Sequence, residues 1–214
     1  MISGPEIKSK TQTISSIVIL LHGYGADGEN LISLAAELSK SFPDTHFFSP
    51  NGILPFENAP FGYQWFGLND RSEQSMLKGL NNAAPYINQF IDYQLQKFNL
   101  SDENLALIGF SQGAILSLHT ALRRTKKIGA VISFAGMLVA PQLLQTELKS
   151  KPPVSLIHGA LDDVIPLPAM QMALAALEYA HIPVETIIEP MLGHSIGTVG
   201  LEFARKALKR NLGL

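Results

Sequence analysis

At residues 105–118 the chain reads L-A-L-I-G-F-S-Q-G-A-I-L-S-L, an apolar run, a Gly-x-Ser-x-Gly turn and a second, mostly apolar segment. A G-x-S-x-G at a strand-to-helix junction is the sequence form of a nucleophile elbow, in which a tight turn holds the serine in a strained backbone conformation. Gly109 and Gly113 leave room for such a turn. The stretch therefore predicts a buried strand, a sharp turn and a helix, with the Ser111 hydroxyl presented to a substrate.

The pentapeptide alone is weak evidence for a reactive serine. Glycine and serine are common, so the pattern arises by chance about once in fifteen chains of this length, and a plain Gly-rich turn is the alternative. A chance match need not fall between an apolar strand and a helix. It would also not be accompanied by a histidine and an acid at workable positions further along the chain, and these are the residues to look for.

The composition limits the classes of protein that fit. The chain has 214 residues, of which 46% are hydrophobic and 16% charged, with a net charge of −2. This is the composition of an ordinary globular protein, and without a long basic run it argues against nucleic-acid or anionic-membrane binding. We interpret the one basic cluster, residues 123–127, as a solvated helix end. The chain has no cysteine, which excludes disulfides, thiolate catalysis and cysteine metal sites.

Targeting signals are not evident in the sequence. The first 13 residues carry Glu6, Lys8 and Lys10 without an apolar stretch, so we expect no signal peptide. No apolar run approaches the length of a transmembrane segment. We therefore expect a cytoplasmic protein with no transmembrane segment.

Short apolar runs alternate with helical patterns along the chain, which predicts βαβ units and one mostly parallel sheet covered by helices on both faces. Asp27 is a candidate N-cap of the first helix, and Pro168 fits the first turn of a later one. The expected strands are Ser16–Leu21, Thr45–Phe48, Leu105–Gly109, Ala130–Phe134, Val154–Ile157 and Val184–Ile188.

The segment from about residue 50 to 82 interrupts this alternation. It is too long for a plain connection and contains five aromatic residues, so we expect an ordered loop with a functional role inside a single domain spanning residues 1–214. Two of these aromatic residues, Trp65 and Phe66, are candidates for the wall of a substrate groove. The alternative is that they belong to the hydrophobic core.

Six histidines are candidates for the base that would activate Ser111. In open α/β sheets ligands bind beyond the carboxyl ends of the strands, so a reactive residue should follow a strand. This criterion favours His194, on the loop after the last strand, over His158, which ends the preceding strand and lies close to the candidate acids. His46 and His119 fall inside a strand and a helix and are expected to be structural, whereas His181 is expected at the surface.

The candidate acids are Asp162 and Asp163, on the loop after the strand at Val154–Ile157. Adjacent side chains on a loop point in different directions, so only one of them is expected to face His194. The plain alternative for both is a turn or helix-capping role. Their spacing alone does not choose between them.

Four ordered motifs together resemble a known family. They are L-L-H-G-Y-G-A-D at residues 20–27, G-F-S-Q-G at 109–113, H-G-x-x-D-x-x-x-P at 158–166 and Gly193-His194. The chain is similar over almost its whole length to the small carboxylesterase, acyl-protein thioesterase and phospholipase family of α/β hydrolases. The resemblance implies the α/β-hydrolase fold and a triad of Ser111, Asp162 and His194, with Asp162 rather than Asp163 as the acid. It also implies a homodimer as a possible assembly.

The resemblance further implies hydrolysis of an ester or thioester, of a small molecule, a lipid or an acylated protein, through an acyl-enzyme and without a metal or organic cofactor. The backbone N–H groups of Tyr24 and Gln112 would form the oxyanion hole. His22, beside Tyr24, could line this loop, but we favour a structural role for it. A small-metabolite ester hydrolase of the same fold and a non-catalytic binding module remain alternatives.

The chain departs from the family pattern at two positions. Tyr24 stands where leucine is frequent, and Gly67 follows Trp65-Phe66 where the family commonly has aspartate. Both departures bear on the substrate pocket rather than on the triad.

Overall fold

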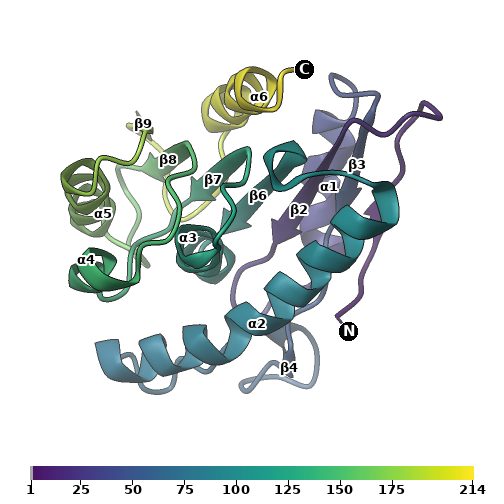
Figure 1. Cartoon of the computed structure of the whole chain (residues 1–214). Helices are drawn as coiled ribbons and strands as arrows, with labels where there is room; N and C mark the ends of the chain where they lie inside the picture. Colours follow the sequence, from purple (N-terminus) through teal and green to yellow (C-terminus); the bar gives the residue numbers. More distant parts are fainter. Residues whose placement is uncertain (1) are drawn as a thin grey trace.

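A twisted seven-stranded sheet forms the centre of the molecule (Figure 1). The computed structural model describes residues 2–214. Within them the strand order is β1-β3-β2-β6-β7-β8-β9, parallel except for β1, which pairs antiparallel with β3 at one edge. The strands are β1 (Glu6–Ile7), β2 (Ser16–Leu21), β3 (Thr45–Phe48), β6 (Leu105–Phe110), β7 (Ala130–Phe134), β8 (Val154–Gly159) and β9 (Val184–Glu189).

All six predicted strands are present, three of them one or two residues longer than expected at their carboxyl ends. Strands β2, β3, β7 and β8 are buried along their full length, as uninterrupted apolar runs require. The edge strand β9 is partly exposed. The two-residue strand β1 and the hairpin of β4 (Leu54–Pro55) and β5 (Tyr63–Gln64) were not expected, because such short pairings leave no period-two pattern in the sequence.

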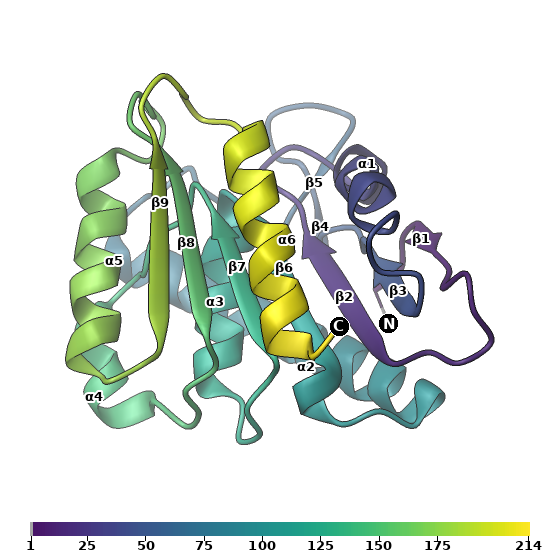
Figure 2. The same ribbon diagram turned by 90° about the horizontal axis from the view of Figure 1, so that it is seen from above.

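Helices cover both faces of the sheet. Helices α1 (Gly28–Leu38) and α6 (Thr198–Leu212) pack on one face, and Figure 2 shows them in front of the strands. On the other face lie α2 (Glu73–Phe98), α3 (Gln112–Arg123), α4 (Leu144–Glu147) and α5 (Leu167–Tyr179). Two short 3₁₀ turns, η1 (Asp102–Asn104) and η2 (Pro141–Leu143), precede β6 and α4. The predicted α/β-hydrolase fold, with helices on both faces of a mostly parallel sheet, is confirmed.

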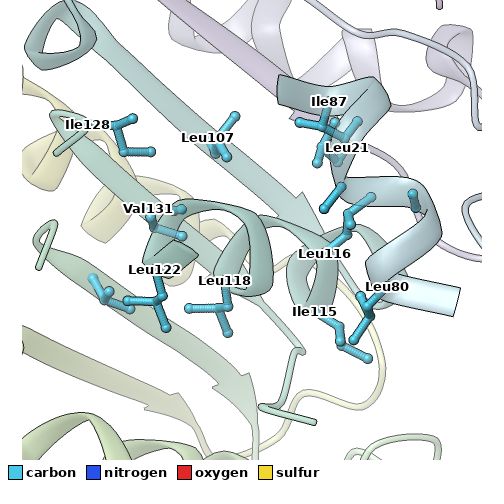
Figure 3. Packing of buried hydrophobic residues seen from close by; sticks show 14 of the residues in the cluster. Leu21, Leu80, Ile87, Leu107, Ile115, Leu116, Leu118, Leu122, Ile128 and Val131 are labelled. Carbon is cyan, nitrogen blue, oxygen red and sulfur yellow. The ribbon is translucent and has the colours of Figure 1, made fainter. Parts of the chain in front are cut away.

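The larger hydrophobic core lies between the sheet and the helices α2, α3 and α5. Figure 3 shows Ile115 and Leu116 of α3 beside Leu80 of α2, and Leu118 and Leu122 further along α3. Every residue of α3 from 112 to 122 is buried, because α2 covers the side that faces away from the sheet. A helix held in this way fixes the turn that precedes it.

Helix α2 begins inside the segment that the sequence assigned to the long loop. Ser72 caps it by accepting a hydrogen bond from the Ser75 N–H, and residues 73–82 form its first turns. The asparagines and Gly79 in these turns have low helix propensity, which hid the helix start in the sequence. Gly79 is required by packing, since a Cβ there would lie 2.6 Å from the Cβ of Phe66.

The basic cluster after α3 is only in part the solvated helix end that the sequence suggested: residues 125–127 are exposed, whereas Arg123 and Arg124 are partly buried. Arg124 donates to Asp102, Asp92 and Asn88 at 2.6, 2.8 and 2.7 Å. Arg123 pairs with Glu147 at 2.6 Å. These arginines tie the end of α3 to α2, η1 and α4, which sequence spacing does not reveal.

Replacing Arg124 with methionine is expected to lower the free energy of unfolding by about 3 kcal/mol, because the Asp102 carboxylate would then be buried without its partner. The side chains of Arg124 and Asp102 are each only 9% exposed. Urea denaturation measures the change. Lys126→Met is the matched control, because this lysine is 79% exposed and 4.0 Å from Asp102. Equal losses in the two variants would contradict a buried ion pair.

The sheet topology places a crevice at the carboxyl ends of β2 and β6. These strands are neighbours, but the chain leaves β2 through α1 toward β3 and leaves β6 through α3 toward β7, in opposite directions along the sheet. Ligands of open α/β folds bind at such a switch point. The loop after β2 and the turn after β6 therefore meet at the expected site.

Candidate active site

Ser111 occupies the sharp turn between β6 and α3. Its backbone has φ 53° and ψ −118°, a strained conformation for a residue with a side chain. Its N–H donates to the carbonyl of Phe134 at 2.9 Å. The turn needs glycine on both sides, since a Cβ at Gly113 would lie 1.9 Å from the Leu21 carbonyl and one at Gly109 2.4 Å from the backbone of Ala114. The tight turn predicted from the sequence is present.

His194 and Asp162 converge on Ser111 from the loops after β9 and β8. His194 Nε2 lies 2.9 Å from Ser111 Oγ, and His194 Nδ1 lies 2.8 Å from Asp162 Oδ2. A carboxylate only accepts hydrogen bonds, so the proton of the neutral imidazole is on Nδ1 and Nε2 has a free lone pair toward the serine hydroxyl. The arrangement can take a proton from Ser111.

The Asp162 side chain is fully buried and every part of its carboxylate has a partner. Its Oδ1 accepts the N–H groups of Val164 and Ile165, each at 2.9 Å. Burial alone would raise the pKa of Asp162, but the hydrogen bonds from His194, Ile165 and Val164 outweigh it and lower this pKa below its usual value. The resulting stability is present above the ordinary aspartate pKa and is lost as pH falls through the lowered value.

The structure also places the competing residues. Asp163 is exposed, and it is Asp162 that contacts His194. His158 is buried and donates through Nε2 to the Ile165 carbonyl at 2.7 Å, with Asp162 Oδ2 3.4 Å away. It does not contact Ser111. His158 supports the loop that holds Asp162.

The remaining buried histidines are structural, as expected. His22 Nε2 accepts the N–H of Gly52 at 2.9 Å, so its proton is on Nδ1, which donates to the Gly23 carbonyl at 2.8 Å. Burial lowers the pKa of His22 and keeps it neutral. His46 stacks on Phe48 with ring centroids 4.5 Å apart, and His119 is bonded to Asn81 at 3.1 Å.

Trp65 and Phe66 belong to the core rather than to the substrate groove, and the prediction that they line it is wrong. They are 0% and 3% exposed, and they pack beneath the site. The Gln112 side chain holds their backbone, accepting from the Trp65 N–H at 2.9 Å and donating to the Phe66 carbonyl at 2.7 Å. No local sequence pattern predicts this bridge, because it joins Gln112 to residues 46 and 47 positions away.

A cavity of about 380 Å³ opens beside Ser111. Tyr24, Gln112 and His194 line it together with residues that sequence reasoning did not identify, chiefly Leu68, Arg71, Met76, Ile115, Met137 and Val164. Its walls are mainly apolar, with Arg71 at one side. The ring of Phe110 lies 5.0 Å from that of His194, and both residues also line a second cavity, of about 500 Å³.

Tyr24 and Gln112, whose backbone N–H groups are the candidate oxyanion donors, both line this cavity. Gln112 opens α3, so its N–H has no partner within the helix. Across residues 2–214 no acceptor is bonded to the N–H of Tyr24. Two unpaired donors beside a serine hydroxyl can hold an anion.

Neither a metal site nor a transmembrane helix is found in the described part of the chain. Residues 2–214 contain no group of three or more His, Asp or Glu side chains placed to hold a metal ion. In the same range no helix has the length and apolar character needed to cross a membrane.

In sequence, the chain resembles known esterases and thioesterases. Residues 2–212 match the phospholipase/carboxylesterase family. Esterase YpfH of Escherichia coli (strain K12) is 28% identical over 204 residues, 95% of this chain and 86% of the relative. Acyl-protein thioesterase 1 homolog 1 of Dictyostelium discoideum is 26% identical over 215 residues, 96% of this chain and 95% of the relative.

The crystal structure of esterase PE8 superposes with a TM-score of 0.94 at 39% identity, covering 98% of this chain and 99% of the other. The family match spans nearly the whole chain, and the fold, the strained serine turn and the hydrogen-bonded histidine and aspartate all accompany it. The chain therefore belongs to the phospholipase/carboxylesterase family and is a carboxylic ester hydrolase of the α/β-hydrolase fold.

Proposed function

We propose that the protein hydrolyses carboxylic esters and thioesters through an acyl-enzyme on Ser111, with His194 as general base and acid and Asp162 orienting the histidine. The observation that carries this proposal is the continuous pair of hydrogen bonds, 2.9 Å from Ser111 Oγ to His194 Nε2 and 2.8 Å from His194 Nδ1 to Asp162 Oδ2. A weak nucleophile with an adjacent, oriented base is the arrangement that acyl transfer requires.

The reaction proceeds in two halves. Ser111 Oγ attacks the substrate carbonyl while His194 takes its proton, and the N–H groups of Tyr24 and Gln112 stabilise the oxyanion. His194 then returns the proton to the departing alcohol or thiol, which leaves an ester on Ser111. In the second half His194 deprotonates a water that attacks this ester, and it returns this proton to Ser111 Oγ as the carboxylic acid is released, which restores the serine hydroxyl. No metal or organic cofactor takes part in these steps.

The apolar cavity beside Ser111 favours a substrate with an apolar acyl group. Its volume of about 380 Å³ suits a small or medium acyl chain held between Met76, Met137 and Val164. The relatives named as acyl-protein thioesterases support thioesters of acylated proteins as a substrate class, and the match to the phospholipase/carboxylesterase family supports lipid esters. A small-metabolite ester is the second candidate. Rates with p-nitrophenyl esters of increasing chain length distinguish a small-ester hydrolase from a long-chain one.

A fluorophosphonate probe is expected to label the wild-type protein on Ser111 and to leave Ser111→Ala unlabelled. The reason is that the activated hydroxyl attacks phosphorus as it would attack a carbonyl, forming a stable adduct. In-gel fluorescence and mass spectrometry of the labelled peptide measure the result.

Ser117→Ala is the matched control, because this serine is buried in α3 and bonds only the Gly113 carbonyl. It should label like the wild type. Persistent labelling of a folded Ser111→Ala protein would exclude Ser111 as the nucleophile, and an unlabelled wild type would favour a non-catalytic binding module. A cytoplasmic location, the single-domain organisation and a homodimer remain predictions.

A further inference from the structure

The loop that carries the Tyr24 N–H is supported by the hairpin of β4 and β5. The Gly25 N–H donates to the Tyr63 carbonyl at 2.9 Å, and the Tyr63 N–H donates to the Ala26 carbonyl at 2.8 Å. Gly25 has φ 79°, a left-handed conformation that turns the loop back toward the site. The placement of the Tyr24 N–H therefore depends on a segment of the 50–72 loop.

The Tyr24 side chain adds a second connection to the same segment. Its hydroxyl donates to the Glu57 carboxylate and accepts from the Asn58 amide at 3.1 Å. Its ring meets that of Phe56 edge-on, with centroids 4.8 Å apart. The Glu57 carboxylate also accepts the Leu68 N–H at 2.9 Å. One carboxylate thus joins the loop after β2, the hairpin and the segment leading to α2.

Gly67 provides the space that this carboxylate occupies. A Cβ at position 67 would lie 3.0 Å from Glu57 Oε2, so an alanine there would push the carboxylate by a few tenths of an ångström. Tyr24 and Gly67 are the two positions at which the sequence departs from the family pattern. In the structure Tyr24 and Gly67 lie next to the same Glu57 carboxylate, so the two departures from the family pattern belong to one set of contacts.

We propose that Glu57 is a positioning residue: through the Tyr24 hydroxyl it fixes the loop that presents the Tyr24 N–H to the reacting carbonyl. This inference rests on the proposed function, in which that N–H stabilises the oxyanion. A donor of this kind acts only when it is held at the right distance, and losing one completely costs about 10²–10³-fold in kcat. Glu57 does not touch the substrate, so its removal should loosen the donor rather than delete it.

The charge states of the pair keep the bond in place. Burial and the hydrogen bond to Glu57 raise the pKa of Tyr24 to about 12, so its hydroxyl stays protonated. The hydrogen bond from Tyr24 and that from Leu68 lower the pKa of Glu57, so it stays ionised as an acceptor. Charge-assisted bonds of this type are stronger than neutral ones.

The test compares Tyr24→Phe, Glu57→Ala and the double variant, because a glutamine at 57 could still accept from the Tyr24 hydroxyl. We expect each single variant to lower kcat for p-nitrophenyl acetate by about tenfold with little change in KM, as loss of one oriented hydrogen bond to a charged group would. The double variant should be no slower than the singles, because both changes break the same interaction. Affinity for a trifluoromethyl ketone, whose hemiketal oxyanion would occupy the same donors, should fall in parallel.

Gly67→Ala supplies an independent probe. It should slow the wild type, because the new Cβ pushes the Glu57 carboxylate from its place, and it should have no further effect in the Glu57→Ala background, which has no carboxylate there. Tyr86→Phe and Glu178→Ala are the matched controls, since both residues are exposed on helices away from the site. Both controls should keep the wild-type kcat.

Unchanged kcat in folded Tyr24→Phe and Glu57→Ala, or effects that add in the double variant, would overturn the positioning role. Glu57 is at the surface, so its variant is expected to fold and provides a kcat value even if Tyr24→Phe does not fold. Ser111→Ala is assayed alongside. Full activity in Ser111→Ala means that the proposed function itself fails, whereas loss of activity there with wild-type rates in the other variants rejects the positioning role alone.

Discussion

His194→Ala is expected to lower kcat for ester hydrolysis by about 10⁶-fold, close to the background rate of the site. Without the imidazole, the proton of the Ser111 hydroxyl has no acceptor at 2.9 Å, and a neutral serine is a poor nucleophile. Departure of the alcohol also loses its proton donor. Initial rates with p-nitrophenyl acetate, normalised by protein concentration, measure the loss. Circular dichroism checks that the variant is folded.

The same loss should appear in Ser111→Ala and in the double variant, because residues that act as one unit have non-additive effects. His181→Asn is the control. His181 is exposed and has φ 55°, a conformation that asparagine tolerates, so this variant should be as active as the wild type. A His194→Ala rate within tenfold of the wild type would instead return His158 to consideration as the base.

The parts of the fold that were predicted correctly depend on local sequence. The strand, turn and helix around Ser111 are encoded by an apolar run, two glycines and a second apolar segment, all within 14 residues. The parallel sheet followed from runs such as those at β2 and β7, which are apolar throughout because both faces are buried. The order of the loops after β8 and β9 then placed Asp162 and His194 at one edge.

The lining of the cavity was not predictable in this way, because it depends on contacts between distant segments. Trp65 and Phe66 are aromatic, as residues of a groove wall often are, yet they lie in the core. Gln112 is hydrogen-bonded to their backbone, and Gly79 leaves room for the Phe66 side chain. The bond between Tyr24 and Glu57 spans 33 positions and involves polar residues in loops, which carry no periodic pattern. Position after a strand favoured His194 and limited the acid to Asp162 or Asp163, and the family resemblance favoured Asp162. The residues that line the cavity became evident only from the packed chain.

Asp162→Asn is expected to lower kcat by about 10⁴-fold, whereas Asp163→Asn should change it less than about twofold. These neighbouring carboxylates make a matched pair, because Asp162 is buried against His194 and Asp163 is exposed. An asparagine at 162 lacks the negative charge that stabilises the imidazolium. Its NH₂ group can also donate to Nδ1 of His194, which places the imidazole proton on Nε2, so that Nε2 cannot accept the proton of Ser111.

The loss in Asp162→Asn would not be explained by unfolding, since the amide oxygen can still accept the N–H groups of Val164 and Ile165 that fix this loop. Thermal denaturation of both variants checks this point, and fluorophosphonate labelling should slow in parallel with kcat. Equal activity losses at 162 and 163 would mean that general charge near the site matters rather than the bond to His194. A loss of activity only in Asp163→Asn would mean that Asp163, the other candidate, is the acid of the triad.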